Sequence, residues 1–235
     1  MLLYDHRPLG AIVTDIEGTT TDIAFVKTVL FPYAEARLEL CLRTIAPTTE
    51  GQSILAQVRA EVGRPTLSLD DSIAQLLTWA RADQKVTPLK TLQGLIWEEG
   101  YRSGAYTSPI YADAATHLQA WHRQGVPLYV YSSGSVAAQK LLFAHTTVGD
   151  LTPCFQGYFD TTIGAKVTPD SYEKIATALA LPPAEILFLS DHPGELAAAQ
   201  QVGWQECAVQ RPGTADFPAG QRVVQTFDQL PITAG

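Results

Sequence analysis

Residues 11–20 read AIVTDIEGTT, and this stretch decides the fold. Its first four residues are apolar or β-branched, whereas the last six are rich in acidic, small and hydroxyl side chains. Two later stretches repeat the pattern: Val126–Tyr131 leads into Ser132–Ser135, and Glu185–Leu189 leads into Ser190-Asp191. Short, continuous apolar runs are typical of strands buried on both faces. The three stretches therefore predict neighbouring strands of a parallel sheet.

Helical patterns separate these runs. Apolar residues recur at helical spacing from Asp113 to Gln124, and a glycine follows as a stop signal. Thr168-Pro169-Asp170 is typical of a helix start with a threonine N-cap, and we expect this helix to run to residue 180. Further helices are expected over 136–143 and 195–202. Such alternation predicts an α/β fold, a doubly wound parallel sheet with right-handed crossovers.

One long segment, residues 25–104, breaks the alternation because it holds helical patterns and hardly a convincing strand. Ile54, Leu55 and Val58, for example, share one face of a helix. We expect a helical cap domain inserted after the first strand. The predicted domains are an α/β core of residues 1–24 and 105–235 and a helical cap of residues 25–104.

The charge balance excludes several classes of partner. Lys and Arg total 16 against 24 Asp and Glu, which gives a formal net charge of −8. Phosphate backbones and anionic membranes repel such a chain unless it carries a local basic cluster, and no run of Lys or Arg is present. We therefore expect no nucleic-acid and no membrane partner. No sequence pattern indicates a dimer interface, so a monomer is expected.

The compartment is predicted from the N-terminus and the cysteines. The first residues lack a basic start followed by a long apolar run, and no apolar run approaches the roughly 20 residues of a membrane helix. Cys41, Cys154 and Cys207 are odd in number and far apart. Reduced thiols account for them better than disulfides or a structural zinc site, so a cytoplasmic location is expected.

Polar residues follow the predicted strands where an open α/β sheet binds its ligands, at the carboxyl ends. Asp15 and Glu17 come directly after the first strand, and Asp191 follows the third. Carboxylates this close repel one another unless a cation lies beside them, and Mg²⁺ suits such an oxygen site. The alternative is that these acidic residues merely occupy a turn, where Asp is common.

The remaining strand end carries hydroxyl groups. Ser132 and Ser133 lead into the helix expected over 136–143, and hydroxyls with backbone N–H groups at a helix start bind phosphate well. Serine is also an ordinary N-cap, so the signal is weak in isolation. Lys166 precedes another helix start, where an ammonium among carboxylates and a phosphate would balance charge.

A carboxylate, a second acid two residues on, a serine, a lysine and a distal aspartate together resemble the four motifs of the haloacid-dehalogenase-like phosphotransferases. The wider blocks resemble more closely the enolase-phosphatases of methionine salvage. Those blocks are residues 13–34, 130–143, 159–166 and 187–191, in the family's order. Glu17 is part of the match, because most of the superfamily has Asp at that place.

The resemblance implies an enzyme that enolises 2,3-diketo-5-methylthiopentyl 1-phosphate and then removes its phosphate, giving the acireductone 1,2-dihydroxy-3-keto-5-methylthiopentene. It implies that Asp15 attacks phosphorus and that Glu17 acts as acid and base. One Mg²⁺ per chain would be held by Asp15, Asp191 and the backbone carbonyl of Glu17. The implied phosphate and substrate ligands are Ser132, Ser133 and Lys166, helped by backbone groups near Gly18 and Thr19.

The sequence leaves three points open. The base of the enolisation is Glu17 or Lys166. The residues after Asp191, His192-Pro193-Gly194-Glu195, depart from the aliphatic residues expected there, which leaves the outer metal shell and the role of Glu195 undecided. The cap residues that touch substrate are not readable from the pattern.

Competing functions on this scaffold are another phosphatase, a dehalogenase, or a non-catalytic module that binds a phosphorylated ligand. Glu17 counts against a dehalogenase, which has no phosphate leaving oxygen to protonate. The complete set of candidate catalytic groups counts against a binding module. A nucleotide-binding dehydrogenase is excluded because no GxGxxG follows the first strand.

Overall fold

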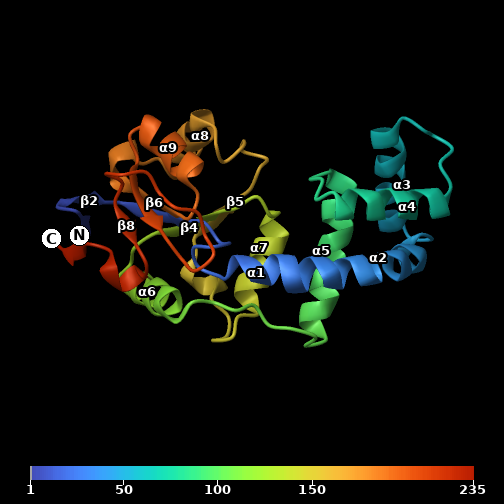
Figure 1. Cartoon of the computed structure of the whole chain (residues 1–235), viewed down its shortest axis with the longest axis horizontal. Coiled ribbons are helices and arrows are strands. Elements are labelled where there is room, and N and C mark those ends of the chain that lie inside the picture. Colours follow the sequence, from blue (N-terminus) through green and yellow to red (C-terminus); the bar gives the residue numbers. More distant parts are fainter. Residues whose placement is uncertain (1) are drawn as a thin grey trace. The chain divides into compact units, whose positions relative to one another are not determined.

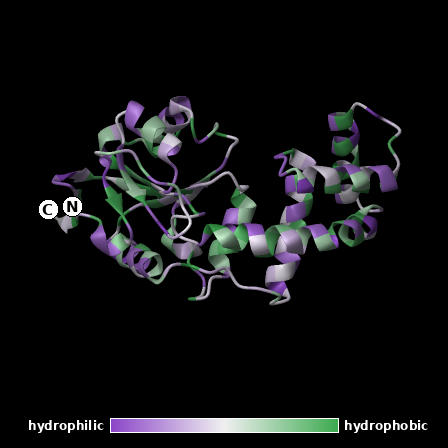
Figure 2. Ribbon diagram, in the orientation of Figure 1, coloured by the Kyte–Doolittle hydropathy of each residue, from purple (hydrophilic) through white to green (hydrophobic). Residues whose placement is uncertain are grey.

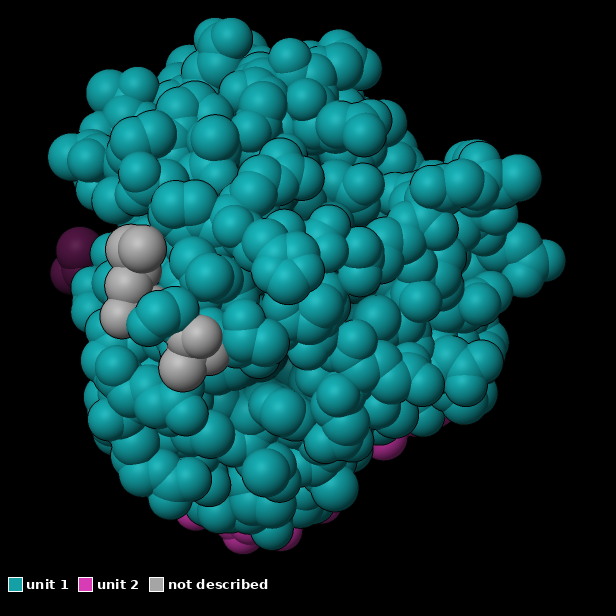
Figure 3. All heavy atoms as spheres, turned by 90° about the vertical axis from the view of Figure 1, so that its left-hand side faces the viewer, with its two compact units in different colours: residues 1–23, 107–235 teal, residues 24–106 magenta. Residues whose placement is uncertain are grey.

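The computed structural model describes residues 2–235. The chain forms two compact units, which Figure 3 shows in separate colours. Unit 1 comprises residues 1–23 and 107–235, and unit 2 comprises residues 24–106. The predicted domain boundaries, 24/25 and 104/105, lie one and two residues from these.

Unit 1 is built on a six-stranded sheet in the order β5-β4-β3-β6-β7-β8. Figure 1 labels β4, β5, β6 and β8 of this sheet. Every neighbouring pair is parallel, as predicted. The strands are β3 (Ala11–Thr14), β4 (Leu128–Tyr131), β5 (Gly157–Phe159), β6 (Ile186–Ser190), β7 (Gln205–Val209) and β8 (Val223–Val224). The first strand of the predicted set, β3, therefore lies between the other two, β4 and β6.

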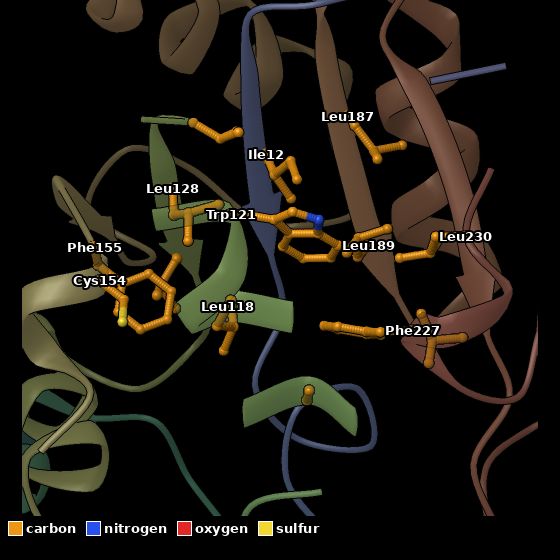
Figure 4. Close-up of a cluster of buried hydrophobic side chains, with 14 of the residues drawn as sticks. Ile12, Leu118, Trp121, Leu128, Cys154, Phe155, Leu187, Leu189, Phe227 and Leu230 are labelled. Atoms are coloured by element: carbon orange, nitrogen blue, oxygen red, sulfur yellow. The ribbon is translucent and has the colours of Figure 1, made fainter. Parts of the chain in front are cut away.

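The sheet is covered on both faces, which explains its continuous apolar strands. Ile12 belongs to one buried cluster and Val13 to another, because successive side chains of a strand point to opposite faces. Leu187 and Phe188 divide between the same two clusters. Figure 4 shows one of them, in which Trp121 packs among leucines and isoleucine of the sheet.

Four helices of unit 1 follow the predicted positions closely. They are α6 (Ala112–Arg123), α7 (Val136–Ala144), α8 (Pro169–Leu179) and α9 (Pro193–Gln201). Thr168 precedes α8 as predicted, but its hydroxyl donates to Ala165 O at 2.7 Å and makes no cap hydrogen bond. Helix α9 starts two residues earlier than predicted because His192 accepts a hydrogen bond from Glu195 N and caps the helix. Short turns of 3₁₀ helix occupy Thr152–Cys154, Pro183–Glu185 and Phe227–Gln229.

A second, antiparallel sheet was not predicted. It joins β1 (Leu2–Tyr4), β2 (Arg7–Leu9) and β9 (Ile232–Ala234) in the order β2-β1-β9. Asp5 and His6 form the β1–β2 turn with positive φ angles of 50° and 64°. Strands of three residues carry little periodicity, and this turn lacks the Asn-Gly or Asp-Gly signal of a two-residue hairpin, so local sequence gave no indication of it.

Unit 2 is helical. Helix α1 (Ile23–Phe25) enters it and continues through a π-helical turn (Val26–Leu30) into α2 (Phe31–Ile45). Helices α3 (Thr49–Val62), α4 (Leu69–Arg81) and α5 (Thr87–Arg102) follow. Residues 25–104 are all described and contain no strand, as the sequence pattern predicts.

The helices of unit 2 are amphipathic and enclose a core of their own. Hydrophobic and hydrophilic segments alternate along their ribbons in Figure 2, and Leu38, Leu42, Leu76 and Leu92 are completely buried. Thr48 and Ser68 cap α3 and α4 through hydrogen bonds from backbone amides. Over the described part of the chain, no helix combines the length and the apolar character needed to cross a membrane.

Candidate active site

Asp15 occupies the carboxyl end of strand β3, between two neighbouring strand ends. Its backbone N–H donates to Leu189 O of β6 at 2.9 Å, and the residue is only 6% exposed. The register pairs Thr14 with Val130 of β4 on one side and with Leu189 on the other. The loops after β3, β4 and β6 therefore leave the sheet at the same edge, where ligands bind in folds of this kind.

Residues Ile16–Thr21 form a tight turn directly after Asp15. The carbonyl of Ile16 accepts hydrogen bonds from the amides of Thr19, Thr20 and Thr21 at 3.2, 2.9 and 3.0 Å. The amide of Gly18, at φ +74°, donates to Thr21 O at 2.8 Å. The resemblance implies that backbone groups near Gly18 and Thr19 help to bind phosphate, but the amides of these two residues are used within the turn. Glu17 projects from the same turn and is partly buried.

Lys166 reaches Asp15 from the loop between β5 and α8. Its Nζ lies 2.6 Å from Asp15 Oδ1 and 2.7 Å from Glu195 Oε2, and the side chain is 9% exposed. The loop is held from behind, because the Tyr172 hydroxyl donates to Lys166 O at 2.7 Å and the Tyr131 hydroxyl donates to Gly164 O at 3.0 Å. This support restricts the position of the ammonium relative to the Asp15 carboxylate.

Glu195 is the residue whose place in the site the sequence left undecided. It lies in the first turn of α9, is 8% exposed, and accepts a hydrogen bond from Ser190 Oγ at 2.9 Å. Both this bond and the ion pair with Lys166 fall on Oε2. The signal available in the sequence was an acidic residue four positions after Asp191, but nothing local indicated that its partner was Lys166.

Asp191 packs against the turn that follows Asp15. A Cβ placed on Gly18 would lie 2.2 Å from Asp191 Oδ2, so a side chain at position 18 would displace the carboxylate. Burial, and then the charge of Asp15, raise the pKa of Asp191 to about 7. The loops after β3 and β6 thus place two carboxylates close enough to interact strongly.

The site holds more negative than positive charge. Burial alone would lower the pKa of Lys166, but the charges of Asp15 and Glu195 outweigh it and raise this pKa well above its usual value. Burial and the charge of Asp15 raise the pKa of Glu195, against the opposing effect of Lys166. One ammonium cannot neutralise three carboxylates, and a further cation would stabilise the charged forms.

This donor set fits Mg²⁺. It does not depend on a cluster of three side chains, because among the described residues no group of three or more His, Cys, Asp or Glu could hold a metal ion. The predicted ligands are two carboxylates and one backbone oxygen, and Mg²⁺ characteristically takes one or two carboxylates and keeps positions for water and phosphate oxygens. The excess negative charge around Asp15 and Asp191 favours a divalent cation there.

The two predicted serines follow β4 at the same edge of the sheet. Ser132 is 3% exposed and its Oγ accepts from Gly134 N at 3.3 Å, which leaves its own O–H to donate. Ser133 is exposed. The start of α7 is already capped, because Ser135 Oγ accepts from Ala138 N and Asp160 Oδ2 accepts from Val136 N. The Ser132 hydroxyl can therefore donate to a phosphate, whereas two amides of the helix start are already used.

The structure thus brings Asp15, Lys166 and Glu195 into direct contact and packs Asp191 against Gly18. Glu17, Ser132 and Ser133 lie in the loops at the same edge of the sheet. His192, which the sequence left open as an outer metal contact, is exposed and caps α9.

Comparison with known proteins identifies the family. The family model for haloacid dehalogenase-like hydrolases matches residues 9–203. The chain belongs to this family. Within it, the chain is 53% identical to Enolase-phosphatase E1 of Methylococcus capsulatus over 88% of this chain and 91% of that protein. It is 47% identical to Enolase-phosphatase E1 of a Sulfurihydrogenibium species over 95% and 98% of the two chains.

A solved structure has the same fold as this chain. The Unknown transcript 4 protein of Saccharomyces cerevisiae superposes with a TM-score of 0.82 at 35% identity, covering 94% of this chain and 100% of that one. The predicted α/β fold of the haloacid-dehalogenase type and the resemblance to the enolase-phosphatases are both confirmed.

Proposed function

We propose that this hydrolase is an enolase-phosphatase that converts 2,3-diketo-5-methylthiopentyl 1-phosphate to the acireductone 1,2-dihydroxy-3-keto-5-methylthiopentene in methionine salvage. The observation that carries the proposal is the buried contact of 2.6 Å between Lys166 Nζ and Asp15 Oδ1 at the end of the central strand. It supplies an oriented carboxylate beside a fixed positive charge. Relatives named Enolase-phosphatase E1, at 45–53% identity, support the choice of substrate.

In the phosphatase step Asp15 attacks phosphorus. Lys166 holds Oδ1, so Oδ2 forms the new bond to phosphorus while the bond from phosphorus to the substrate oxygen breaks. Glu17 gives its proton to that leaving oxygen. It then takes a proton from a water molecule, which attacks phosphorus and releases phosphate and the free Asp15 carboxylate.

Phosphoryl transfer develops charge on the oxygens around phosphorus and needs positioned cations and donors. Lys166 and the hydroxyls of Ser132 and Ser133 are the groups of this chain that we assign to those oxygens. Asp15, Asp191 and the Glu17 carbonyl would hold one Mg²⁺, which when bound supplies positive charge to the phosphate and to the diketone oxygens.

In the enolase step a proton leaves the carbon next to a carbonyl. The ammonium of Lys166 is paired with two carboxylates, so it serves better as a donor to the enolate oxygen than as a base. We therefore assign proton removal to Glu17, the other candidate, and enolate stabilisation to Lys166.

The remaining expectations are part of the same proposal. Unit 2 would serve as the helical cap that excludes water and reads the methylthio end of the substrate. A monomer in the cytoplasm is proposed. Cys41, Cys154 and Cys207 are free thiols, and the last two are buried, which supports a reducing compartment.

The test supplies the diketone phosphate with Mg²⁺ and follows enol absorbance and free phosphate together. We expect the enol to rise first and phosphate to appear as the enol decays. Phosphate release from simple esters with no turnover of the diketone phosphate would retain a phosphatase and overturn this substrate. Absence of metal-dependent turnover of any ester would instead favour a binding module.

A further inference from the structure

Arg211 is a buried cation that the proposed reaction does not use. It follows strand β7 by two residues, and its side chain is 3% exposed. A guanidinium buried to this degree is costly unless it is paired and hydrogen-bonded. Its Nη1 and Nη2 donate to the two carboxylate oxygens of Asp113 at 3.1 and 2.7 Å, and Nη1 also donates to Gln225 O at 2.9 Å.

The Asp113 carboxylate is also fixed by several hydrogen bonds. It lies in the first turn of α6 and accepts a third hydrogen bond, from Phe227 N at 2.7 Å. Burial by itself would raise the pKa of Asp113, but the hydrogen bonds from Arg211 and Phe227 outweigh it and lower this pKa. The ion pair is a charged, bidentate contact between α6 and the end of β7, two elements 98 residues apart in the chain.

The same guanidinium contacts the turn after the nucleophile. Arg211 Nε donates to Thr19 O at 3.2 Å, and the next carbonyl, Thr20 O, accepts from Tyr111 N at 3.0 Å. The guanidinium carbon also lies 4.2 Å from the centre of the Tyr111 ring. The turn uses its own amides internally, so these two carbonyl contacts tie it to the rest of unit 1.

We propose that Arg211, paired with Asp113, is a positioning residue that fixes the Ile16–Thr21 turn and, through it, the carboxylates of Asp15 and Glu17. The inference rests on the proposed function for the roles of those two carboxylates. The turn begins one residue after Asp15 and contains Glu17, so movement of its carbonyls moves both groups. Small displacements of catalytic groups cost large factors in rate.

The structure offers matched variants. R211K keeps the charge but cannot make the bidentate fork. D113N keeps the shape of the partner and removes its charge, and it serves as a second variant should R211K fail to fold. R222K is the control, because Arg222 forms an ion pair with Asp5 in the same unit and has no contact with the turn among its hydrogen bonds and ion pairs to described residues.

The experiment measures kcat and KM for phosphate release well below the melting temperature, and hydrogen exchange of the Thr19, Thr20 and Thr21 amides by NMR. For R211K and D113N we expect kcat to fall roughly 10- to 100-fold with KM changed less than about threefold. Exchange of the three amides should become faster. R222K should leave both measurements unchanged.

A merely structural ion pair would behave differently. Both variants would then melt at lower temperature while keeping kcat and the protection of the three amides, and the proposal would be overturned. Hydrogen exchange needs no substrate, so it tests the anchoring of the turn separately from the proposed function. If the wild-type protein released no phosphate, the proposed function would fail. Faster amide exchange in the variants would still support the anchoring of the turn, and unchanged exchange would overturn it.

Discussion

Both units carry exposed ion pairs, but unit 1 also has buried ones. In unit 2 the ion pairs join exposed side chains, as in Arg43–Glu39 and Arg81–Glu35, whose members are each at least 39% exposed. In unit 1 Lys166 with its carboxylates and the pair Arg211–Asp113 are 13% exposed or less. Buried charges are costly to desolvate, whereas exposed pairs cost and contribute little. The Lys166 pairs lie where the chemistry is proposed, and the Arg211–Asp113 pair contacts the turn that follows Asp15.

Unit 2 shows how apolar packing alone can stabilise a helical unit. Its four long helices enclose leucines, isoleucines and valines, and two of them begin at hydroxyl caps. Apolar burial of this kind stabilises a helical unit without any internal charge. The buried charges of unit 1 therefore call for a different explanation from stability alone, and four substitutions test it.

D15N should have the largest effect. The amide cannot act as a nucleophile, so phosphate release should fall by roughly 10³-fold or more. Enolisation should persist in part, because we assign it to Glu17 and Lys166. Simultaneous recording of enol absorbance and phosphate checks both steps, and full hydrolysis by this variant would remove Asp15 from its role.

K166M should weaken both steps and the fold. The methionine leaves Asp15 and Glu195 buried without their shared cation, so kcat should fall roughly 100-fold. The free energy of unfolding should drop by about 3–5 kcal/mol. Kinetics and urea unfolding measure the two effects, and kinetics equal to those of the wild type would show that Lys166 is a bystander.

E195Q should have a smaller effect. Both contacts of Glu195 fall on one oxygen, so a glutamine can retain them while losing the negative charge. We expect kcat to fall about tenfold, because the retained contacts lose the extra strength that a charged acceptor gives them. E173Q on the exposed face of α8 is the matched control. A loss as large as that of K166M would mean that the Glu195 charge itself takes part in the reaction.

R81A in unit 2 should have the smallest effect. The Arg81–Glu35 pair is exposed, so unfolding free energy should change by less than about 1 kcal/mol and kcat should stay the same. Urea unfolding and steady-state kinetics check this. A loss above about 2 kcal/mol would break the contrast between the two units.

Many of the candidate site residues could be predicted from the order of residue types along the chain. The rule that ligands bind at strand ends identified Asp15, Ser132 and Asp191, because each follows a continuous apolar run. The pairing of Lys166 with Glu195 could not be predicted, because each residue has an ordinary local explanation at a helix start. Neither could Arg211, which no motif marks.

The sequence by itself determined the parallel sheet, the helical insertion and the polar residues at the strand ends. Each of these depends on apolar periodicity or on signals within a few neighbouring residues. The tertiary structure decided which charges meet. Lys166 and Asp15 are 151 residues apart, and their 2.6 Å contact exists because the loop after β5, two places from β3 in the sheet, reaches the end of β3. Burial and electrostatic pairing depend on all surrounding elements at once, which is why the folded chain alone assigns the carboxylates their partners.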